Sequence, residues 1–237
     1  MDLKIDKHIS GQFSKELEGM LSHVLDMGGI VEQQIAQALE AIGQFDSKLA
    51  QKIIKEDEKI NAYEVLIDEE CARVIAKRQP AAIDLRIILA IAKIIADLER
   101  IGDETCRMVR AAQEHFNKTE RQFLVDLDHM GQQVLQMFKA VLDALARMDS
   151  EAAYDVYKLD KKIDKAYEGI TRQLMTYMME DPRSIPKIMD VMWATRSLER
   201  IGDRCQNISE HVIYLIKGKD VRHAPTERIE AILAAKK

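Results

Sequence analysis

One short acidic sequence that occurs twice is the first feature of this chain that could support chemistry. The sequence LERIGD appears at two places 100 residues apart, and it supplies Glu99 with Asp103 and Glu199 with Asp203. On a helix, a spacing of four residues brings both carboxylates to one face, with Cβ atoms about 5–6 Å apart. Like charges so placed destabilise a helix by roughly 0.2–0.5 kcal/mol unless a cation lies between them. Each copy is therefore a candidate half of a metal site.

A second set of oxygen ligands lies upstream of each copy. Asp160 and Asp164 are also four residues apart, the equivalent positions of the first half hold Asp57 and Asn61, and Asn207 adds one more turn after the second LERIGD. If the helices that carry these residues pack antiparallel, four or five oxygen ligands can meet. Oxygen ligands suit hard or borderline divalent cations, and we expect Mg²⁺, Mn²⁺, Fe²⁺ or Zn²⁺. The predicted metal ligands are Glu99, Asp103, Asp57, Glu199, Asp203, Asn207, Asp160 and Asp164.

A purely structural interpretation of the same carboxylates stays open. Arg100 lies three residues before Asp103 and Arg200 three before Asp203, so both aspartates could be salt-bridged on a solvated face. The occurrence of the acidic pattern on two helices in each half favours the metal site. Arg107 stands one turn after the first LERIGD, where the second half has an asparagine, and it would compete with a cation. We therefore expect the first site to bind metal more weakly.

Other catalytic patterns are missing from the sequence. None of the six histidines forms the Glu-x-x-His motif of di-iron bundles, and there is no P-loop, GxGxxG or GxSxG. The cysteines Cys71, Cys106 and Cys205 are an odd number without a CxxC pair, which is typical of buried thiols in a reducing compartment. The sequence therefore predicts a protein that is not an enzyme. A di-metal carboxylate enzyme and a helical scaffold without metal remain the alternatives.

The composition points to an all-α fold. The 237 residues include only 10 Gly and 4 Pro, while 32% are charged, 47% hydrophobic and 5% aromatic, which favours long amphipathic helices. A net charge of −5 gives no basic surface for nucleic acid or for membrane lipid. The first residues have no apolar core of a signal peptide, and the longest apolar stretch, 87–96, is half a membrane span. We expect a cytoplasmic protein.

The elements that must position the acidic residues are duplicated. Similar residues recur at an offset of 103 in the first part of each half and of 100 around LERIGD. Each half divides into three helices, so the predicted fold is a tandem duplication of two antiparallel three-helix bundles in series. The predicted divisions are an N-terminal tail at 1–11, a first bundle at 12–114, a second bundle at 115–217, and a C-terminal tail at 218–237 with a possible short helix. A tight turn is expected near Asn117.

Matched small residues indicate where these helices start and where they touch. Gly28 and Gly131 fall at equivalent places in the apolar seam of the first helix of each half, where they would allow a neighbouring helix to approach closely. The glycine within each LERIGD is interpreted in the same way. Ser47 and Ser150 are expected to cap the second helices. The methionines near residue 180 are expected to fill the core, with a partner-binding surface as the alternative.

The longer motifs resemble the PhoU family, the phosphate-specific transport system accessory proteins of bacteria. The resemblance rests on QPAAIDLR at 79–86, the two LERIGD copies and NISE at 207–210, and it covers nearly the whole chain. It implies a pair of three-helix bundles whose E/D-x-x-x-D motifs bind metal ions, matched here by the carboxylates named above. It also implies a cytoplasmic, often dimeric adaptor that links the ATPase subunit of the phosphate ABC transporter, PstB, to the sensor kinase PhoR. Such an adaptor keeps phosphate-starvation genes off when phosphate is plentiful, and it reaches the membrane only through its partners.

Overall fold

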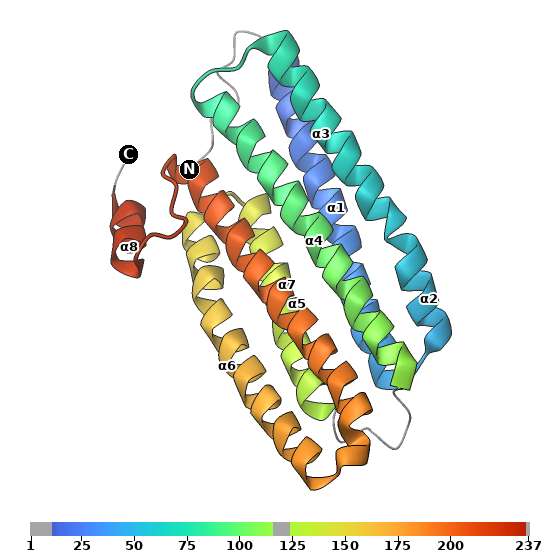
Figure 1. Ribbon diagram of the computed structural model, residues 1–237. Coiled ribbons are helices and arrows are strands. Elements are labelled where there is room, and N and C mark those ends of the chain that lie inside the picture. The colour runs from blue at the N-terminus through green and yellow to red at the C-terminus, as the bar shows by residue number, and fades with distance from the viewer. Residues whose placement is uncertain (1–10, 116–123, 236–237) are drawn as a thin grey trace.

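The computed structural model describes residues 11–115 and 124–235, and these residues form long helices without a strand. The helices are α1 (Gly11–Gln44), α2 (Ser47–Glu56), α3 (Glu58–Arg78), α4 (Ile83–His115), α5 (Val125–Ala146), α6 (Ser150–Glu180), a 3₁₀ turn (Pro182–Ser184), α7 (Ile185–Lys217) and α8 (Thr226–Ala234). The predicted fold of duplicated three-helix bundles is confirmed (Figure 1). The first helix already includes Gly11, which was assigned to the tail, and the turn expected near Asn117 lies outside the described residues.

Aspartates begin the second helix of each half. The side chain of Asp46 accepts hydrogen bonds from the backbone N–H groups of Lys48 and Leu49, and Asp149 does the same at the start of α6. These bonds satisfy N–H groups that have no partner within the helix. The N-caps are thus Asp46 and Asp149, one residue before the serines that the sequence suggested.

The second helix is continuous in the second half and interrupted in the first. At Asp57, α2 gives way to α3, and the backbone N–H of Ile60 donates to the Asp57 carbonyl at 2.9 Å. This i to i+3 contact is of the 3₁₀ type and tightens the chain locally. The first half therefore has one more helix than the three that were expected, and the interruption falls on a predicted metal ligand.

The two halves lie side by side and not merely one after the other. Helix α4 packs along α7 and α1 packs against α5, with the members of each pair running in opposite directions (Figure 1). A Cβ atom built on Gly28 would lie 2.6 Å from Leu142 Cδ2, and one built on Gly131 would clash with Leu39. Since both residues of one pair are repeat-equivalent to those of the other, the interface repeats itself about an approximate two-fold axis. The predicted close approach at these glycines is confirmed.

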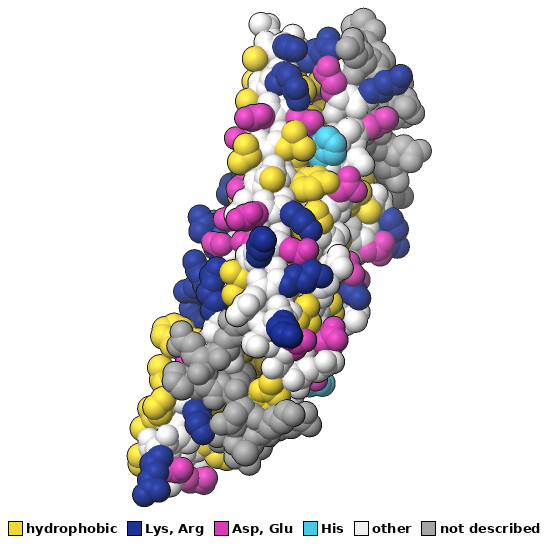
Figure 2. Space-filling model, turned by 90° about the vertical axis from the view of Figure 1, so that its right-hand side faces the viewer, with side chains coloured by type: hydrophobic (Ala, Val, Ile, Leu, Met, Phe, Trp, Pro, Cys, Tyr) yellow, Lys and Arg dark blue, Asp and Glu magenta, His cyan; other side chains and the backbone are white. Residues whose placement is uncertain are grey.

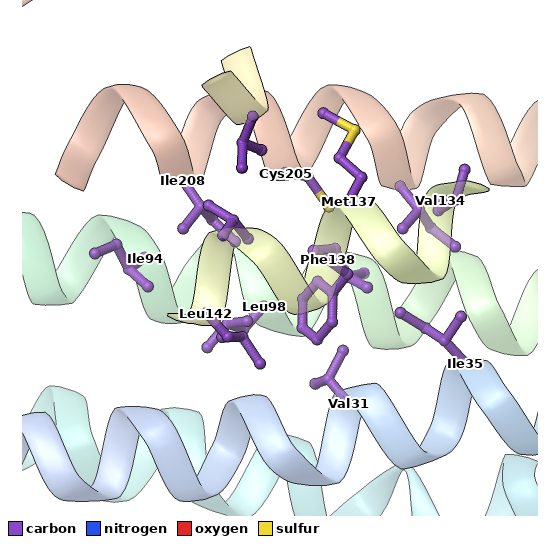
Figure 3. Close-up of a cluster of buried hydrophobic side chains, with 14 of the residues drawn as sticks. Val31, Ile35, Ile94, Leu98, Val134, Met137, Phe138, Leu142, Cys205 and Ile208 are labelled. Atoms are coloured by element: carbon purple, nitrogen blue, oxygen red, sulfur yellow. The ribbon is translucent and has the colours of Figure 1, made fainter. Parts of the chain in front are cut away.

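The halves share one hydrophobic core. Figure 3 shows buried side chains from α1, α4, α5 and α7 converging in one cluster, among them Val31, Leu98, Phe138 and Ile208. Phe138 is fully buried and lies among side chains from both halves. A substitution that overpacks this junction or leaves a cavity in it would therefore destabilise both halves.

Buried polar contacts fix the register of α4 against α7. Asp97 accepts from Arg204 Nη1 at 3.2 Å, and Glu104 accepts from Ser197 Oγ at 3.1 Å, a pair at the equivalent positions. Arg200 Nη1 also donates to Glu104 Oε1 at 3.0 Å. Because Asp97 and Glu104 are buried while the two arginines are partly exposed, removing the arginine would leave a buried carboxylate with one partner fewer, which is destabilising. These contacts hold the two LERIGD helices in a fixed relation.

Two further features complete the fold. Helix α8 follows α7 after a short connection and lies at the outer side of the second half (Figure 1). Among the residues that the structure describes, no helix combines the length and hydropathy needed to cross a lipid bilayer. The three cysteines are free and buried, as their number and spacing predicted.

Candidate metal centre

Three predicted ligands of the second half come together between α6 and α7. Asp160, Asp164 and Asp203 each offer a carboxylate oxygen, and these oxygens lie within 4.8 Å of one another. Asp160 is buried, Asp164 is half-buried and Asp203 is exposed, so the group runs from the helix interface out to solvent. This three-aspartate group, together with Glu199, is called the second-half centre below. Its all-oxygen composition suits a hard divalent cation.

Asp160 is the most unusual member of this centre. Its Oδ1 atom is buried and has no hydrogen-bond partner, although nearly all buried polar groups in proteins have one. Burial and the negative charges of Asp164 and Asp203 raise the pKa of Asp160 to about 7. Asp160 can approach α7 because residue 202 is glycine, whose added Cβ would lie 3.3 Å from Asp160 Oδ1. The glycine inside LERIGD thus makes room for a carboxylate.

Glu199 contributes a second carboxylate oxygen without a partner. Its side chain is 14% exposed, and its buried Oε2 atom has no hydrogen bond. Arg196 Nη1 lies 3.4 Å from the other oxygen, Oε1. Burial and the charge of Asp203 raise the pKa of Glu199, while Arg196 opposes the shift. One carboxylate oxygen of Glu199 therefore accepts from Arg196, and the other has no hydrogen-bond donor.

Asn207 does not extend the centre as the sequence suggested. Its Nδ2 atom donates to Asp97 Oδ1 at 3.4 Å, on the face of α7 that packs against α4. The same Asp97 carboxylate also lies near Arg204 and His211. Asn207 comes eight residues after Glu199, which is about 80° more than two full turns, so it has rotated from the α6 side of the helix toward the interface between the halves. Asn207 belongs to that interface.

The arginines of LERIGD do not neutralise the aspartates of that motif. Arg200 pairs with Glu104 across the interface between the halves, and Arg100 Nε lies 3.5 Å from Glu99 Oε2. Within the described residues, no lysine, arginine or histidine lies within salt-bridge distance of Asp203 or Asp164. The salt-bridge interpretation is therefore wrong for Asp203.

The first half places its equivalent residues in a different chemical setting. Asp57 Oδ1 accepts a hydrogen bond of 2.8 Å from Gln34 Nε2, on α1. A Cβ built on Gly102 would lie 2.9 Å from the same oxygen, so this glycine also makes room for a carboxylate. Elsewhere in the part of the chain that the structure describes, no second group of three carboxylates matches the spacing of the second-half centre. The protein itself provides the donor that Asp57 needs.

The other first-half ligands lie near an arginine and near one another. Arg107 Nη2 lies 3.9 Å from Asp103 Oδ2, and Arg107 also donates to Glu104 at 2.6 Å. Burial and the charges of Asp103 and Glu64 raise the pKa of Glu99. Asp57, Glu99 and Asp103 are called the first-half centre below. Arg107 therefore lies beside Asp103, as the prediction of a weaker first site requires, while that weaker binding stays a prediction.

Two residues near the first-half centre were missed by the sequence analysis. The charge of Glu64 helps to raise the pKa of Glu99, and burial together with the charge of Asp68 raises the pKa of Glu64 itself. Its position two helical turns after Asp57 could have revealed it, but the equivalent residue of the second half is a tyrosine. Gln34 could not be found in this way, because a polar residue near a helix seam gives no sign of which side chain it meets.

The surface around these centres carries charges of both signs and exposed apolar residues. Figure 2 shows acidic, basic and hydrophobic side chains interspersed along the face of the molecule that lies on the right in Figure 1. On the hairpin of α6 and α7, Met175, Met179 and Trp193 are exposed to 52%, 84% and 60%. Met189, on the same hairpin, is exposed as well. The prediction that methionines here fill the core is wrong for Met175, Met179 and Met189.

Comparison with known sequences identifies relatives along the whole chain. The family model described as PhoU domain matches residues 24–112 and 127–212. A phosphate-specific transport system accessory protein PhoU from Serratia marcescens is 52% identical over 234 residues, which is 99% of this chain and 96% of that protein. The protein of the same name from Escherichia coli K12 is 50% identical, over 99% of this chain and 97% of its own length.

Solved structures show the same likeness. The crystal structure of PhoU from Pseudomonas aeruginosa superimposes with a TM-score of 0.82 at 47% identity, covering 87% of this chain and 100% of that one. The phosphate transport system regulatory protein PhoU from Streptococcus pneumoniae gives a TM-score of 0.79 at 29% identity, over 88% and 99% of the two chains. The duplicated helical fold is therefore common to this chain and to both structures.

Proposed function

The chain belongs to the PhoU family, and on that premise we propose that it is an accessory regulator of phosphate uptake that acts by contact with other proteins. The proposal rests mainly on how much of the sequence this chain shares with the named relatives. About half of the residues are identical over 99% of the chain, with proteins named for the phosphate-specific transport system. Since almost all of each relative is matched, the role of the relatives can be transferred as a whole.

We propose two partners for this regulator. They are PstB, the ATPase subunit of the phosphate ABC transporter, and the sensor histidine kinase PhoR, both met at the cytoplasmic side. By linking them, the protein would keep phosphate-starvation genes off when phosphate is plentiful, and it would do so as a homodimer. The exposed methionines and Trp193 of the α6–α7 hairpin support a role by contact, because Trp and Met are enriched in protein interfaces.

We further propose that the second-half centre binds a divalent cation. Asp160 Oδ1 and Glu199 Oε2 are buried carboxylate oxygens without a donor, and a cation is the partner that both lack. Asp164 and Asp203 supply oxygens on the solvent side. Mg²⁺, Mn²⁺ or Fe²⁺ fits this set of ligands better than Zn²⁺, since no imidazole or thiolate belongs to the group. The first-half centre would bind the same ion more weakly.

The cation would neutralise charge and carry out no reaction. Without it, α6 and α7 hold carboxylates against each other, which disfavours their contact. With it, the two helices that also carry the exposed hairpin residues are held together. No histidine in the described part of the chain belongs to either acidic centre, so the structure gives no support to a di-metal enzyme, and we propose no catalytic role.

Removal of metal tests this proposal on the protein alone. A chelator should leave the far-ultraviolet circular dichroism almost unchanged, because the shared apolar core holds the helices together. It should lower the melting temperature by several degrees, since a ligand at a hundredfold excess over its Kd stabilises the fold by about 2.7 kcal/mol. Loss of most of the helicity would show that the metal is part of the core. If calorimetric titration detects no binding of Mg²⁺, Mn²⁺, Fe²⁺ or Zn²⁺, the metal proposal is wrong and the protein is a helical scaffold without metal.

The partners are tested separately, in the native host. Affinity capture of the protein with and without phosphate in the medium should recover the transporter ATPase and the sensor kinase. Asp160→Asn should weaken that capture, and the matched first-half change Asp57→Asn should weaken it much less. Recovery of neither partner under either condition would contradict the adaptor role whatever the metal titration shows.

A further inference from the structure

A pocket lies between α1 and α3, which pack against each other in the first half (Figure 1). Its volume is about 340 Å³. A cavity of roughly 150 Å³ with apolar walls accepts a benzene ring, so this one has room for a ring with a further group attached. We call it the α1–α3 pocket, and its walls include Lys15, Gly19 and Met20 of α1 and Arg73, Val74 and Lys77 of α3.

The base of the α1–α3 pocket is apolar. Met20 and Val74 line it and are both buried in the core of the first half. Gly19 leaves the α1 wall open, because a Cβ atom added there would meet no atom within 4 Å. An apolar part of a ligand can therefore lie on Met20 and Val74, beside Gly19.

The two carboxylates of the pocket wall already have partners within the protein. Arg78 donates to both oxygens of Glu16, at 3.0 Å from Nε and 2.9 Å from Nη2. His23 Nδ1 lies 2.9 Å from Glu70 Oε2, and Arg73 Nη2 lies 3.6 Å from Glu70 Oε1. Since Arg78 and His23 are not wall residues, these contacts take up the negative charge and leave the wall lysines without a partner.

The two wall lysines, Lys15 and Lys77, carry unpaired charges. Both are exposed, and in the part of the chain that the structure describes no Asp or Glu lies within salt-bridge distance of either. The contacts of the two carboxylates fix the register of α1 against α3, so that the start of α1 lies beside the end of α3. Lys15 and Lys77 are therefore on opposite walls at the same end of the pocket. Their like charges favour an anion between them.

Other cations add to the positive charge at this end of the pocket. The hydrogen bonds of Arg78 and the charges of Lys77 and Arg73 lower the pKa of Glu16, although burial opposes the shift. Several cations thus act on one carboxylate, and Lys15 precedes it directly in the sequence. The cations outnumber the carboxylates here, which raises the local concentration of anions.

The second half does not repeat this arrangement of charges. The positions equivalent to Arg73 and Lys77 hold Thr176 and Glu180, and Gln173 takes the place of Glu70. The Nε2 atom of Gln173 donates to the Tyr177 hydroxyl at 3.1 Å, along its own helix. Since the second half has the same helices without these cations, the fold does not require them.

We propose that the α1–α3 pocket binds a small organic dianion. The two unpaired lysines match its two negative charges, Arg73 adds a third donor group, and the apolar body of the ligand lies on Met20 and Val74. A phosphate monoester with a ring attached has this chemistry. Arg73 lies about 24 Å along α3 from Asp57, so the pocket is separate from the acidic centres and needs no metal.

Three small anions test the pocket on the full chain, after metal has been removed with a chelator and the chelator dialysed away. They are phenyl phosphate, benzoate, which has one charge fewer, and inorganic phosphate, which lacks the ring. At about pH 8 a phosphate monoester carries nearly two negative charges, because its second pKa is about 6. Phenyl phosphate should perturb the methyl resonances of Met20 and Val74 and bind about tenfold more tightly than either of the others. Added salt should weaken its binding, since the lysines are exposed.

Matched variants of the chain make this test specific. Gly19→Leu should weaken phenyl phosphate binding at least about tenfold by filling the pocket, without loss of stability, because leucine favours a helix more than glycine does. Gly29→Leu, on the same helix and equally free of close atoms, should leave the affinity unchanged. Lys15→Gln combined with Lys77→Gln should remove the preference over benzoate. Lys52→Gln combined with Lys55→Gln removes the same charge from the exposed side of α2 and should keep that preference.

Three results would overturn the proposal. The first is a set of Met20 and Val74 methyl resonances that millimolar phenyl phosphate leaves unperturbed. The second is equal binding of the three anions, which would show that the pocket reads neither the second charge nor the ring. The third is an affinity that Gly19→Leu and Gly29→Leu change equally, because binding would then lie outside the pocket.

Discussion

The two acidic centres share a backbone arrangement and differ in what satisfies their buried aspartate. In each, a glycine of LERIGD leaves space for the carboxylate of Asp57 or Asp160. In the first half Gln34 donates to that carboxylate, while Met137 occupies the equivalent position in the second half and Asp160 Oδ1 has no partner. The buried aspartate of the duplicated site thus has a protein donor in one copy and none in the other.

This difference shows that metal ligands alone do not define such a site. Both halves keep the E-x-x-x-D pair of the LERIGD helix, and both keep an aspartate on the facing helix. The two centres diverge through neighbours on other helices or one turn away, such as Gln34 and Arg107, which meet the carboxylates of the first half. Donors supplied by the protein compete with a cation for the same oxygens.

The largest expected effect is on metal affinity. Replacing Glu199 and Asp203 together by Ala removes two carboxylates from the second-half centre, and we expect Mn²⁺ binding there to weaken about a hundredfold, or about 2.7 kcal/mol. Replacing Glu99 and Asp103 by Ala should change the tightest Mn²⁺ affinity less than threefold. Isothermal titration calorimetry on both double variants measures the difference. Equal losses would contradict the asymmetry of the two halves.

A smaller effect is expected where the halves are alike. Gly28→Leu inserts a side chain against Leu142 and should destabilise the fold by roughly 1–3 kcal/mol or more through overpacking. Gly131→Leu should cost a similar amount against Leu39, because the two contacts are equivalent. Gln33→Leu, at an exposed position of the same helix as Gly28, serves as the control. Urea midpoints that coincide for Gly28→Leu and Gln33→Leu would refute the interface described here.

The smallest effect, taken per pH unit, is a dependence of stability on pH in the absence of metal. Because the pKa of Asp160 is about 7 in the folded chain and near 3.9 when unfolded, the folded state holds more protons between these values. Stability should therefore fall as the pH rises from about 4 to about 7, by up to about 1.4 kcal/mol per pH unit for this one group. Melting temperatures of the metal-free protein measure the slope, and Asp160→Asn should flatten it. If Asp57→Asn flattened the dependence of the melting temperature on pH as much as Asp160→Asn, the assignment of this dependence to Asp160 would be wrong.

The sequence was sufficient for the fold and for the core of the second-half centre. The doubled LERIGD, the offset between the halves and the seam glycines predicted the duplicated bundles and the close approach at Gly28. Four-residue spacing placed Asp160, Asp164 and Asp203 among the ligands because helical periodicity alone determines which residues share a face.

What the sequence could not provide depends on contacts between helices. Asn207 has the right spacing for a ligand, but the rotation of α7 turns it toward Asp97. The donation by Gln34 to Asp57 links residues on two helices, and the packing angle between those helices is not encoded in the spacing of either one. The side-by-side arrangement of the halves likewise depends on surfaces that meet only after each half has formed.

The most direct test of the account exchanges the residue that distinguishes the two centres. Met137→Gln gives the second half the amide donor that Gln34 provides in the first, and all of the carboxylates remain in place. Calorimetric titration with Mn²⁺ should show the tightest site weakened about tenfold in Met137→Gln, and Gln34→Met should strengthen the weaker site. A tightest Mn²⁺ affinity unchanged by Met137→Gln, in a variant that melts as the parent does, would contradict the claim that the unsatisfied Asp160 carboxylate determines where the cation binds.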